Sequence, residues 1–181
     1  MQHPYGLIST HHLDLYCLTV DELLELGEGK DPFGSRPFKN PYGVLTKENL
    51  HMANRIKDVR ENPSHIRWYY RVIVDRESNI VVGSTSFHAA PDERGMIEIG
   101  VGIAPEEQGK GFASEAISGM WTWASTEPSV KFLRYSVSPN NVASMKIIEN
   151  FDFPKVGEQH DEVDGLEYIF ESSVKDYLDW V

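Results

Sequence analysis

The segment from Ala104 to Ala116 (APEEQGKGFASEA) joins a glycine-rich turn to the start of a helical pattern. Gly109 and Gly111 can adopt positive φ and let the backbone approach a ligand closely, so that successive N–H groups converge on phosphate oxygens. The amino end of the following helix adds a partial positive charge, and Lys110 can add a full one. The spacing predicts a site for an anionic, phosphate-like group.

Two familiar phosphate motifs do not fit this segment. A Walker loop requires Gly where Ala104 stands and Ser or Thr where Gly111 stands. A dinucleotide fingerprint that begins at Gly109 requires a further Gly where Ser114 stands. Taken in isolation, the segment is also compatible with an ordinary helix entry in which the glycines only turn the chain.

A third phosphate motif does fit. The pattern Gln/Arg-x-x-Gly-x-Gly/Ala is met by Gln108, Gly111 and Ala113, and it resembles the pyrophosphate-binding motif of the GNAT superfamily of acyl-CoA-dependent N-acyltransferases. A second family-like signature, Asn-x-x-Ser, follows at Asn141 and Ser144. The order of expected elements is similar along nearly the whole chain. The pattern is most similar to the branch that contains the ribosomal-protein N-alpha-acetyltransferases, a branch that also holds enzymes with other acceptors.

This resemblance implies acetyl-CoA as co-substrate. Its pyrophosphate is expected on the glycine turn, and its pantetheine along the backbone of the strand that precedes the turn. A strand N–H nearby would polarise the thioester carbonyl. The residues expected to bind acetyl-CoA are Val101, Ile103, Gln108, Gly109, Lys110, Gly111, Phe112, Ala113, Ser114 and Asn141.

The resemblance also implies the catalytic groups. An alkylamine with a pKa of ~10 must lose a proton before it attacks a thioester. Glu98 is the expected proton acceptor, directly or through water, although a solvated surface residue is an alternative reading of this carboxylate. Relatives often protonate the leaving thiolate from a tyrosine, whose position here is Ile148. Ser144, a water held by Asn141, or Tyr135 remain as candidate acids.

A further departure from the family pattern is Asp152, which replaces the usual glycine of a Gly-Phe pair. The leading expectation is nevertheless an N-acetyltransferase that moves an acetyl group directly to a primary amine of a small molecule or a peptide N-terminus. The runner-up is a non-catalytic acyl-CoA-binding sensor or partner-binding protein on the same fold. A nucleotide-phosphate binder is a third, more remote class.

The elements that must position these residues follow from hydrophobic periodicity. Alternation at 13–17 predicts a strand, and a helix from Thr19 should end at the glycines that follow it. The proline-rich stretch 30–45 predicts a loop long enough to be a functional flap. A second helix is expected to be capped by Thr46 and to end before Pro63.

The rest of the chain predicts an antiparallel meander followed by alternating helices and strands. We therefore expect a single domain over 1–181 of the α+β class, a GNAT-type fold with a mixed, mostly antiparallel central sheet flanked by helices. The expected elements are strands at 68–75, 80–90, 96–103, 132–137, 153–156 and 166–171, a helix between Pro105 and Pro128, a helix capped by Asn140 or Asn141, and a short helix from Ser173 to Trp180.

The net charge of the chain narrows the classes of partner that it can bind. It holds 17 Lys+Arg against 28 Asp+Glu, a net charge of −11, and 33 C-terminal residues from 149 onward account for −8 of it. That balance argues against nucleic acid, which requires clustered cations. A loop expected between the last two strands holds Glu158, Asp161, Glu162 and Asp164. We hypothesise that this loop attracts a cationic amine, although a solvated acidic turn is an equal alternative.

The remaining residue patterns argue for a soluble enzyme without a metal. The seven histidines lack ligand spacing, so no metal site is expected. Cys17 stands alone in a strand and is expected to be a buried thiol. The charge-free run 78–91 is too short and polar to cross a bilayer, and the first residues lack the pattern of a signal peptide. We expect a cytoplasmic monomer or homodimer.

Overall fold

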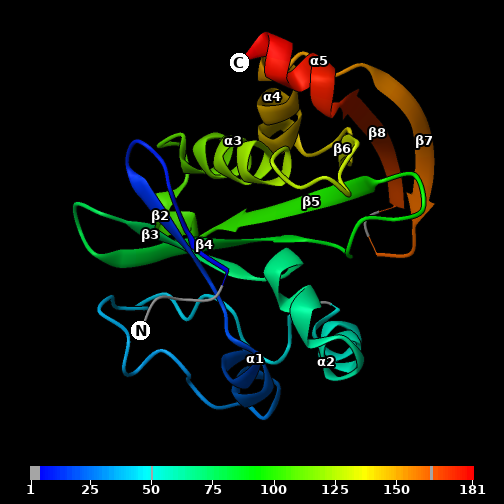
Figure 1. Ribbon diagram of the computed structural model, residues 1–181. Helices are drawn as coiled ribbons and strands as arrows, with labels where there is room; N and C mark the ends of the chain where they lie inside the picture. The colour runs from blue at the N-terminus through cyan, green and yellow to red at the C-terminus, as the bar shows by residue number, and fades with distance from the viewer. Residues whose placement is uncertain (1–4, 50, 164) are drawn as a thin grey trace.

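The computed structural model describes residues 5–49, 51–163 and 165–181. Its strands form one sheet in the order β1-β2-β3-β4-β5-β6-β8-β7 (Figure 1). Neighbouring strands run antiparallel except β5 and β6, which are parallel. The strands are β1 (Leu7–Ser9), β2 (Leu13–Cys17), β3 (Arg71–Asp75), β4 (Ile80–Phe87), β5 (Met96–Ile103), β6 (Phe132–Val137), β7 (Lys155–Asp161) and β8 (Gly165–Ser173).

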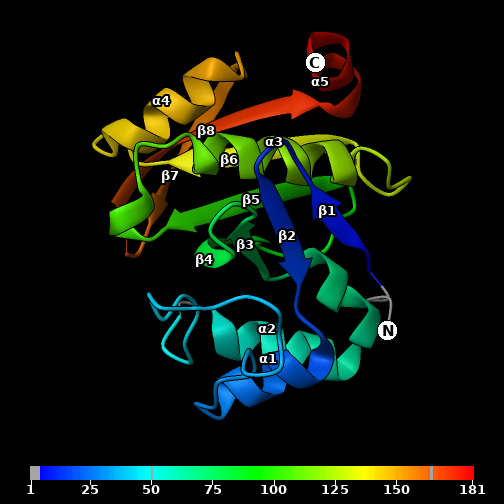
Figure 2. The same ribbon diagram turned by 90° about the vertical axis from the view of Figure 1, so that its left-hand side faces the viewer.

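Helices cover both faces of this sheet. Figure 2 shows α1 and α2 on one face and α3, α4 and α5 on the other. The parallel pairing of β5 and β6 requires a crossover, which α3 supplies. The helices are α1 (Val20–Gly27), α2 (Met52–Glu61), α3 (Phe112–Ala124), α4 (Val142–Asn150) and α5 (Val174–Trp180), with 3-10 turns η1 (Pro63–Trp68) and η2 (Pro105–Glu107).

Each face of the sheet buries its own apolar cluster. On the α3 side, the fully buried ring of Trp121 stacks on Phe153 at 4.6 Å and meets Phe151 edge-on at 4.8 Å between ring centroids. On the α1 side, Leu23 and Val59 are fully buried. The two clusters hold the sheet between them, because burying such side chains is the main favourable term in folding.

Several predicted elements are confirmed in type and extent. The strand at 96–103 has the predicted bounds. Thr19 caps α1 through a capping box with Glu22, and Asn141 caps α4. The expectation of an α+β fold with a mixed, mostly antiparallel sheet is therefore correct.

The predicted helix from Thr46 is wrong at its start. Residues 46–49 form a turn in which the Asn49 side chain accepts the Thr46 N–H, and α2 begins only at Met52. His51 precedes it with a φ of 63°, a left-handed conformation that no helix can pass through. Leu50, which falls within the predicted helix, lies outside the described residues.

The predicted strands at 68–75 and 80–90 are longer than the strands β3 and β4 of the structure. Trp68 belongs to η1, and β3 begins three residues later at Arg71. The next strand, β4, ends at Phe87 rather than at residue 90. The aromatic run at 68–70 thus packs as the end of a helical turn, and the sequence pattern alone does not distinguish that from a strand.

The acidic loop predicted between the last two strands is a β-hairpin. Its residues Glu158 and Asp161 lie within β7, where they pair with Tyr168 and Gly165 of β8. Glu162 lies in the connecting turn, and Asp164 lies outside the described residues. Alternation in this segment is polar on both faces, which hides a strand from a hydrophobic pattern.

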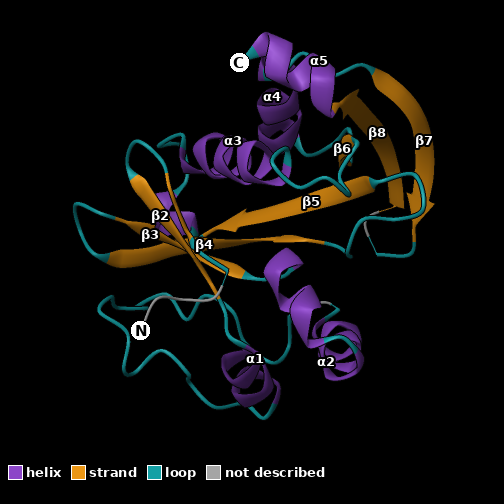
Figure 3. Ribbon diagram, viewed as in Figure 1, coloured by secondary structure: helices purple, strands orange, loops and turns teal. Residues whose placement is uncertain are grey.

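Figure 3 shows a long connection between α1 and α2 without regular structure, as the prolines predict. It is nonetheless anchored, because the Arg36 guanidinium pairs with Glu22 at 2.6 Å and Lys39 forms a bridge with Ile80 of β4. Among the described residues, no helix is both long and apolar enough to cross a membrane.

Candidate active site

Strands β5 and β6 separate partway along their length. They pair only from Met96 to Glu98, opposite Phe132 to Arg134. Beyond that point β6 continues alongside β8, whereas β5 stays with β4 as far as Ile103. From Ile99 onward, the edge of β5 that faces β6 therefore borders an opening. No strand of the described sheet is hydrogen-bonded to this edge there. Such an edge can pair with the amide groups of an extended ligand.

A cavity of about 480 Å³ occupies this opening. That volume lies within the range usual for small-molecule sites. One wall is β5, the second is the glycine turn with the start of α3, and the third is α4. The lining residues are Val101, Gly102, Ile103, Glu107, Gln108, Gly109, Gly111, Phe112, Ala113, Ser114, Asn141, Ala143, Ser144, Lys146 and Ile147.

The cavity brings together ten of the twelve residues predicted as site residues; the two that do not line it are Glu98 and Lys110. Lys110 instead pairs with Glu107 at 2.6 Å. That carboxylate also accepts the Tyr42 hydroxyl at 2.7 Å, so the long α1–α2 loop is tied to the rim of the cavity. Among the lining side chains, the cation is Lys146, which sequence reasoning missed because it looked for charge only within the turn.

The glycine turn has the backbone geometry expected of an anion site. Gly109 and Gly111 have φ values of 78° and 84°, and a Cβ on either would meet no atom within 4 Å. Gly111 is the N-cap of α3 and offers no side-chain acceptor to the first N–H groups of the helix. These donors at Phe112 and its neighbours lack intrahelical partners, as at every helix start, and they line the cavity.

The α4 wall contributes a hydroxyl pair. Asn141 accepts the Ser144 N–H at 3.1 Å and so fixes the first turn of α4. The Ser144 side chain interacts with the phenol of Tyr135 on β6. Burial raises the pKa of this phenol above its ordinary value of 10.0, while the interaction with Ser144 opposes that shift. The phenol therefore stays protonated at neutral pH, and the lowering by Ser144 is that of a hydroxyl that donates toward the phenol oxygen.

Ile148, at the position of the usual tyrosine, lies in the apolar core with 1% of its surface exposed. Met145 and Ile147 of the same helix pack against that core. Ile148 offers neither a polar atom nor access to the cavity. Of the residues predicted as candidate acids, Ser144 and Tyr135 are the pair that the fold brings into contact.

Glu98 lies on the other face of β5, at the point where the strands separate. Its side chain is 16% exposed, and its Oε1 lies 3.7 Å from Nδ1 of His88. The backbone N–H of His88 donates to the Glu98 carbonyl at 2.8 Å. Sequence reasoning missed His88 because it placed this residue inside an ordinary strand. The one signal in the sequence is its alternation with Ser86 across Phe87.

The Cys17 thiol is buried, as predicted, with 1% exposure. Burial raises its pKa to about 11, so the thiol is protonated at neutral pH. It contacts backbone carbonyls of Leu18 and Ile66 at 3.4 and 3.5 Å. This residue packs in the core and carries no nucleophilic thiolate.

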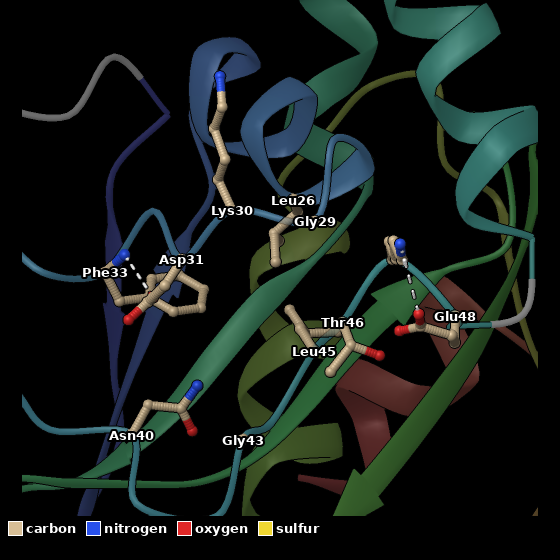
Figure 4. Close-up of a pocket in the computed structure, with 11 residues that line it drawn as sticks. Leu26, Gly29, Lys30, Asp31, Phe33, Asn40, Gly43, Leu45, Thr46 and Glu48 are labelled. Atoms are coloured by element: carbon tan, nitrogen blue, oxygen red, sulfur yellow. Dashed lines mark hydrogen bonds and ion pairs between the residues drawn. The ribbon is translucent and has the colours of Figure 1, made fainter.

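A second cavity, of about 370 Å³, lies between the end of α1 and the long loop that follows it (Figure 4). Leu26, Phe33 and Leu45 form its apolar side. Asp31 accepts the Phe33 N–H at 2.9 Å and so shapes the loop rather than facing a ligand. None of the predicted site residues lines this cavity.

Comparisons with known proteins point to one family. A family model described as an acetyltransferase (GNAT) domain matches residues 38–154. An uncharacterized N-acetyltransferase of Bacillus licheniformis, p20, is 32% identical over 85 residues, which make up 47% of this chain and 48% of p20. The chain thus spans about half the length of that curated relative.

Two solved structures share the fold. The ribosomal L7/L12 alpha-N-protein acetyltransferase RimL, in complex with coenzyme A, is 16% identical with a TM-score of 0.63, over 93% of this chain and 98% of that one. A chimera of the Vibrio cholerae spermidine N-acetyltransferase SpeG and hSSAT is 17% identical with a TM-score of 0.63, over 93% and 99%. At these identities the likeness concerns the fold alone.

The residues matched by the family model run from the loop after α1 to Pro154, directly before β7. They include the separation of β5 from β6, the glycine turn and the α4 wall. The motif, the order of the elements and the family model therefore agree. The chain belongs to the GNAT acetyltransferase family.

Proposed function

We propose that this protein transfers the acetyl group of acetyl-CoA to a primary amine of a small molecule or a peptide N-terminus. The observation that carries the proposal is the cavity between β5, the glycine turn and α4, which gathers nine of the ten predicted acetyl-CoA-binding residues in one place. We further propose that residues 1–181 act as one domain, because both apolar clusters pack on the same sheet.

The cavity suits acetyl-CoA at both ends. The N–H groups from Gln108 to Ser114 would hold the pyrophosphate, since they combine a glycine turn with a helix start. Lys146 supplies a positive charge to the same cavity. At the other end, the backbone of Val101 and Ile103 would pair with the pantetheine amides, and Asn141 lies across from them.

Acetyl transfer then needs one proton removed and one supplied. A neutral amine attacks the thioester, the new N–C bond forms and the C–S bond breaks. The proton of the amine leaves toward Glu98, on the open face of β5. Ser144, backed by the Tyr135 phenol, donates a proton to the thiolate. Because the leaving thiol has a pKa near ~8.5, this second transfer assists the reaction without being indispensable.

We propose a cationic acceptor. Asp161, at the end of β7, acts electrostatically on His88, and Glu162 follows it in the turn of the β7–β8 hairpin. A negative field at the entrance raises the local concentration of cationic amines. The named structural neighbours act on a ribosomal protein and on spermidine, both of which carry amines.

A second candidate is a non-catalytic acyl-CoA sensor, favoured by the apolar Ile148 at the usual tyrosine position. One assay separates the two candidates. The protein is incubated with acetyl-CoA and pools of polyamines, aminoglycosides, amino acids and peptides, and free thiol is measured from neutral to alkaline pH. The enzyme requires amine-dependent thiol release, whereas binding of acetyl-CoA without such release at any pH supports the sensor.

A further inference from the structure

His88 lies just after β4 and turns its ring onto the face of β5 that carries Glu98 and Gly100. Its Nδ1 is 3.7 Å from Glu98 Oε1. Its Nε2 points to the other side, over Gly100, where an added Cβ would lie only 3.1 Å from it. The ring therefore has one nitrogen toward a carboxylate and one toward the backbone of β5, next to the residues that line the cavity.

This position lies across the strand from the acetyl-CoA side. Ile97 and Ile99 are buried in the apolar cluster under α3, and Val101 extends that side into the cavity. Glu98 and Gly100 alternate onto the opposite face, because successive residues of a strand point to opposite sides. Beyond Glu98, β6 no longer pairs with β5. An amine that reaches the thioester from this open face passes His88.

The groups around the ring keep it available as a base. Glu98 from β5 and Asp161 from β7 favour the charged imidazolium, while Arg55 from α2 and His51 before it disfavour that form. Desolvation is the largest influence, and it holds the pKa of His88 below its ordinary value of 6.5. At neutral pH the ring is neutral. With its proton on Nδ1, toward Glu98, Nε2 has a free lone pair.

We propose that His88 is the general base of this enzyme, taking the proton of the acceptor amine on Nε2 while the Glu98 carboxylate, 3.7 Å from Nδ1, stabilises the imidazolium that forms. The proposal rests on the acetyltransferase function proposed above and deepens it. The proton reaches the neighbourhood of Glu98 through an imidazole, and Glu98 becomes a positioning residue.

The step balances without any further reactant. As the N–C bond forms, the amine proton moves to Nε2 and His88 becomes an imidazolium beside the Glu98 carboxylate. The C–S bond breaks, and the thiolate takes a proton from Ser144, whose oxygen is reprotonated through the Tyr135 phenol and, between turnovers, by water. The His88 side chain is 50% exposed, so the imidazolium returns its proton to water between turnovers.

The test compares four proteins: wild type, His88→Ala, Glu98→Gln and the control His12→Ala. His12 is a matched control because it also contacts a carboxylate, Glu115, at 2.9 Å, but lies between β1 and β2, which β3 and β4 separate from β5 in the sheet. Rates are measured from acidic to alkaline pH with acetyl-CoA and the amine acetylated by the wild type, spermidine and an alanine-initiated peptide being tried first. Circular dichroism and acetyl-CoA binding check that each variant is folded.

We expect kcat of the wild type and of His12→Ala to fall with pH below about 6.5 as His88 is protonated. His88→Ala should lose about 10²–10⁴-fold in kcat, with KM for acetyl-CoA unchanged, and should lose that acidic limb. Added imidazole should restore part of the rate. Glu98→Gln should retain the limb but shift it to lower pH, because the lost carboxylate no longer stabilises the imidazolium.

A gentler variant, Gly100→Ala, covers the case in which His88→Ala does not fold. Its added Cβ should displace the ring and lower kcat while acetyl-CoA binding stays intact. An acidic limb that persists in His88→Ala, or a full rate in both His88→Ala and Gly100→Ala, would overturn the proposal while leaving the acetyltransferase function in place. A silent wild type with every amine would instead remove the proposed function itself.

Discussion

The side chain of Ser144, at the start of α4, acts on the phenol of Tyr135 on β6 and lowers its pKa, against the larger effect of burial. Ser144 lines the cavity, whereas Tyr135 is buried with 5% of its surface exposed. The pair thus places a buried phenol beside a cavity-facing hydroxyl. We propose that it takes the place of a tyrosine on α4 itself, where the residue is Ile148.

This pair predicts a coupled loss of activity. Ser144→Ala and Tyr135→Phe should each lower kcat by about tenfold, below the usual gain from proton transfer because a thiolate is a tolerable leaving group. The double variant should lose no more than either single one, since both act in one relay. Thiol release with purified variants measures this, and additive losses would show that the two residues act separately.

We expect Lys146 to supply the positive charge that binds the phosphates of acetyl-CoA. Because it lines the cavity while Lys110 is paired with Glu107, Lys146→Gln should raise KM for acetyl-CoA by about 3–10-fold. Lys110→Gln should change KM less. Steady-state kinetics at low salt would measure both KM values. A larger rise in KM for Lys110→Gln than for Lys146→Gln would instead support the prediction from the glycine turn that Lys110 binds acetyl-CoA.

The tie between Glu22 and Arg36 predicts a pH-dependent stability. Burial alone would raise the pKa of Glu22, but hydrogen bonds from Arg36 and Thr19 outweigh it and hold the pKa below 4.5. Because the folded pKa is depressed, the stabilisation is complete above the unfolded value of ~4.3 and is lost as pH falls through the folded one. Glu22→Gln should therefore cost about 1–3 kcal/mol at neutral pH.

Urea denaturation at neutral and at acidic pH measures this cost. The difference between wild type and Glu22→Gln should shrink once the pH is below the folded pKa of Glu22. Lys30 with Glu28 supplies a control pair, since both side chains are about 60% exposed. Replacing Glu28 by Gln should change stability little at any pH. A cost for Glu22→Gln that is independent of pH would mean that packing rather than charge is lost.

The acidic hairpin predicts a salt-sensitive acceptor KM. Neutralising Asp161 and Glu162 should raise KM for a polyamine several-fold at low salt, and added salt should erase the difference. Asp179→Asn in α5 serves as control, because Figure 1 places α5 at the end of the molecule away from the β7–β8 turn. A KM that ignores both salt and charge would identify the hairpin as a solvated turn.

The sequence predicts the site residues best at positions where the backbone conformation requires a particular residue type. Gly109 and Gly111 are required by positive φ, Asn141 by the helix start it caps, and the strand at 96–103 by its period. Each of these is a local property. The ten predicted residues that line one cavity were found because the motif and the helix start are local as well.

What the sequence missed depends on tertiary contacts. The pairing of Lys110 with Glu107 removes a cation that a motif alone assigns to phosphate. The ring of His88 meets Glu98 only because β4 and β5 are adjacent and antiparallel. The hairpin of β7 and β8 has a polar pattern on both faces, so only its partner strand reveals it.

The most direct measurement of the central claim is mass spectrometry of the products. Wild-type protein, acetyl-CoA and a mixture of primary amines are incubated at neutral and alkaline pH, and acetylated amine and free coenzyme A are quantified together. The account predicts the two products in equal amounts and only with the protein present. Saturable binding of acetyl-CoA with no acetylated amine at any pH would contradict it.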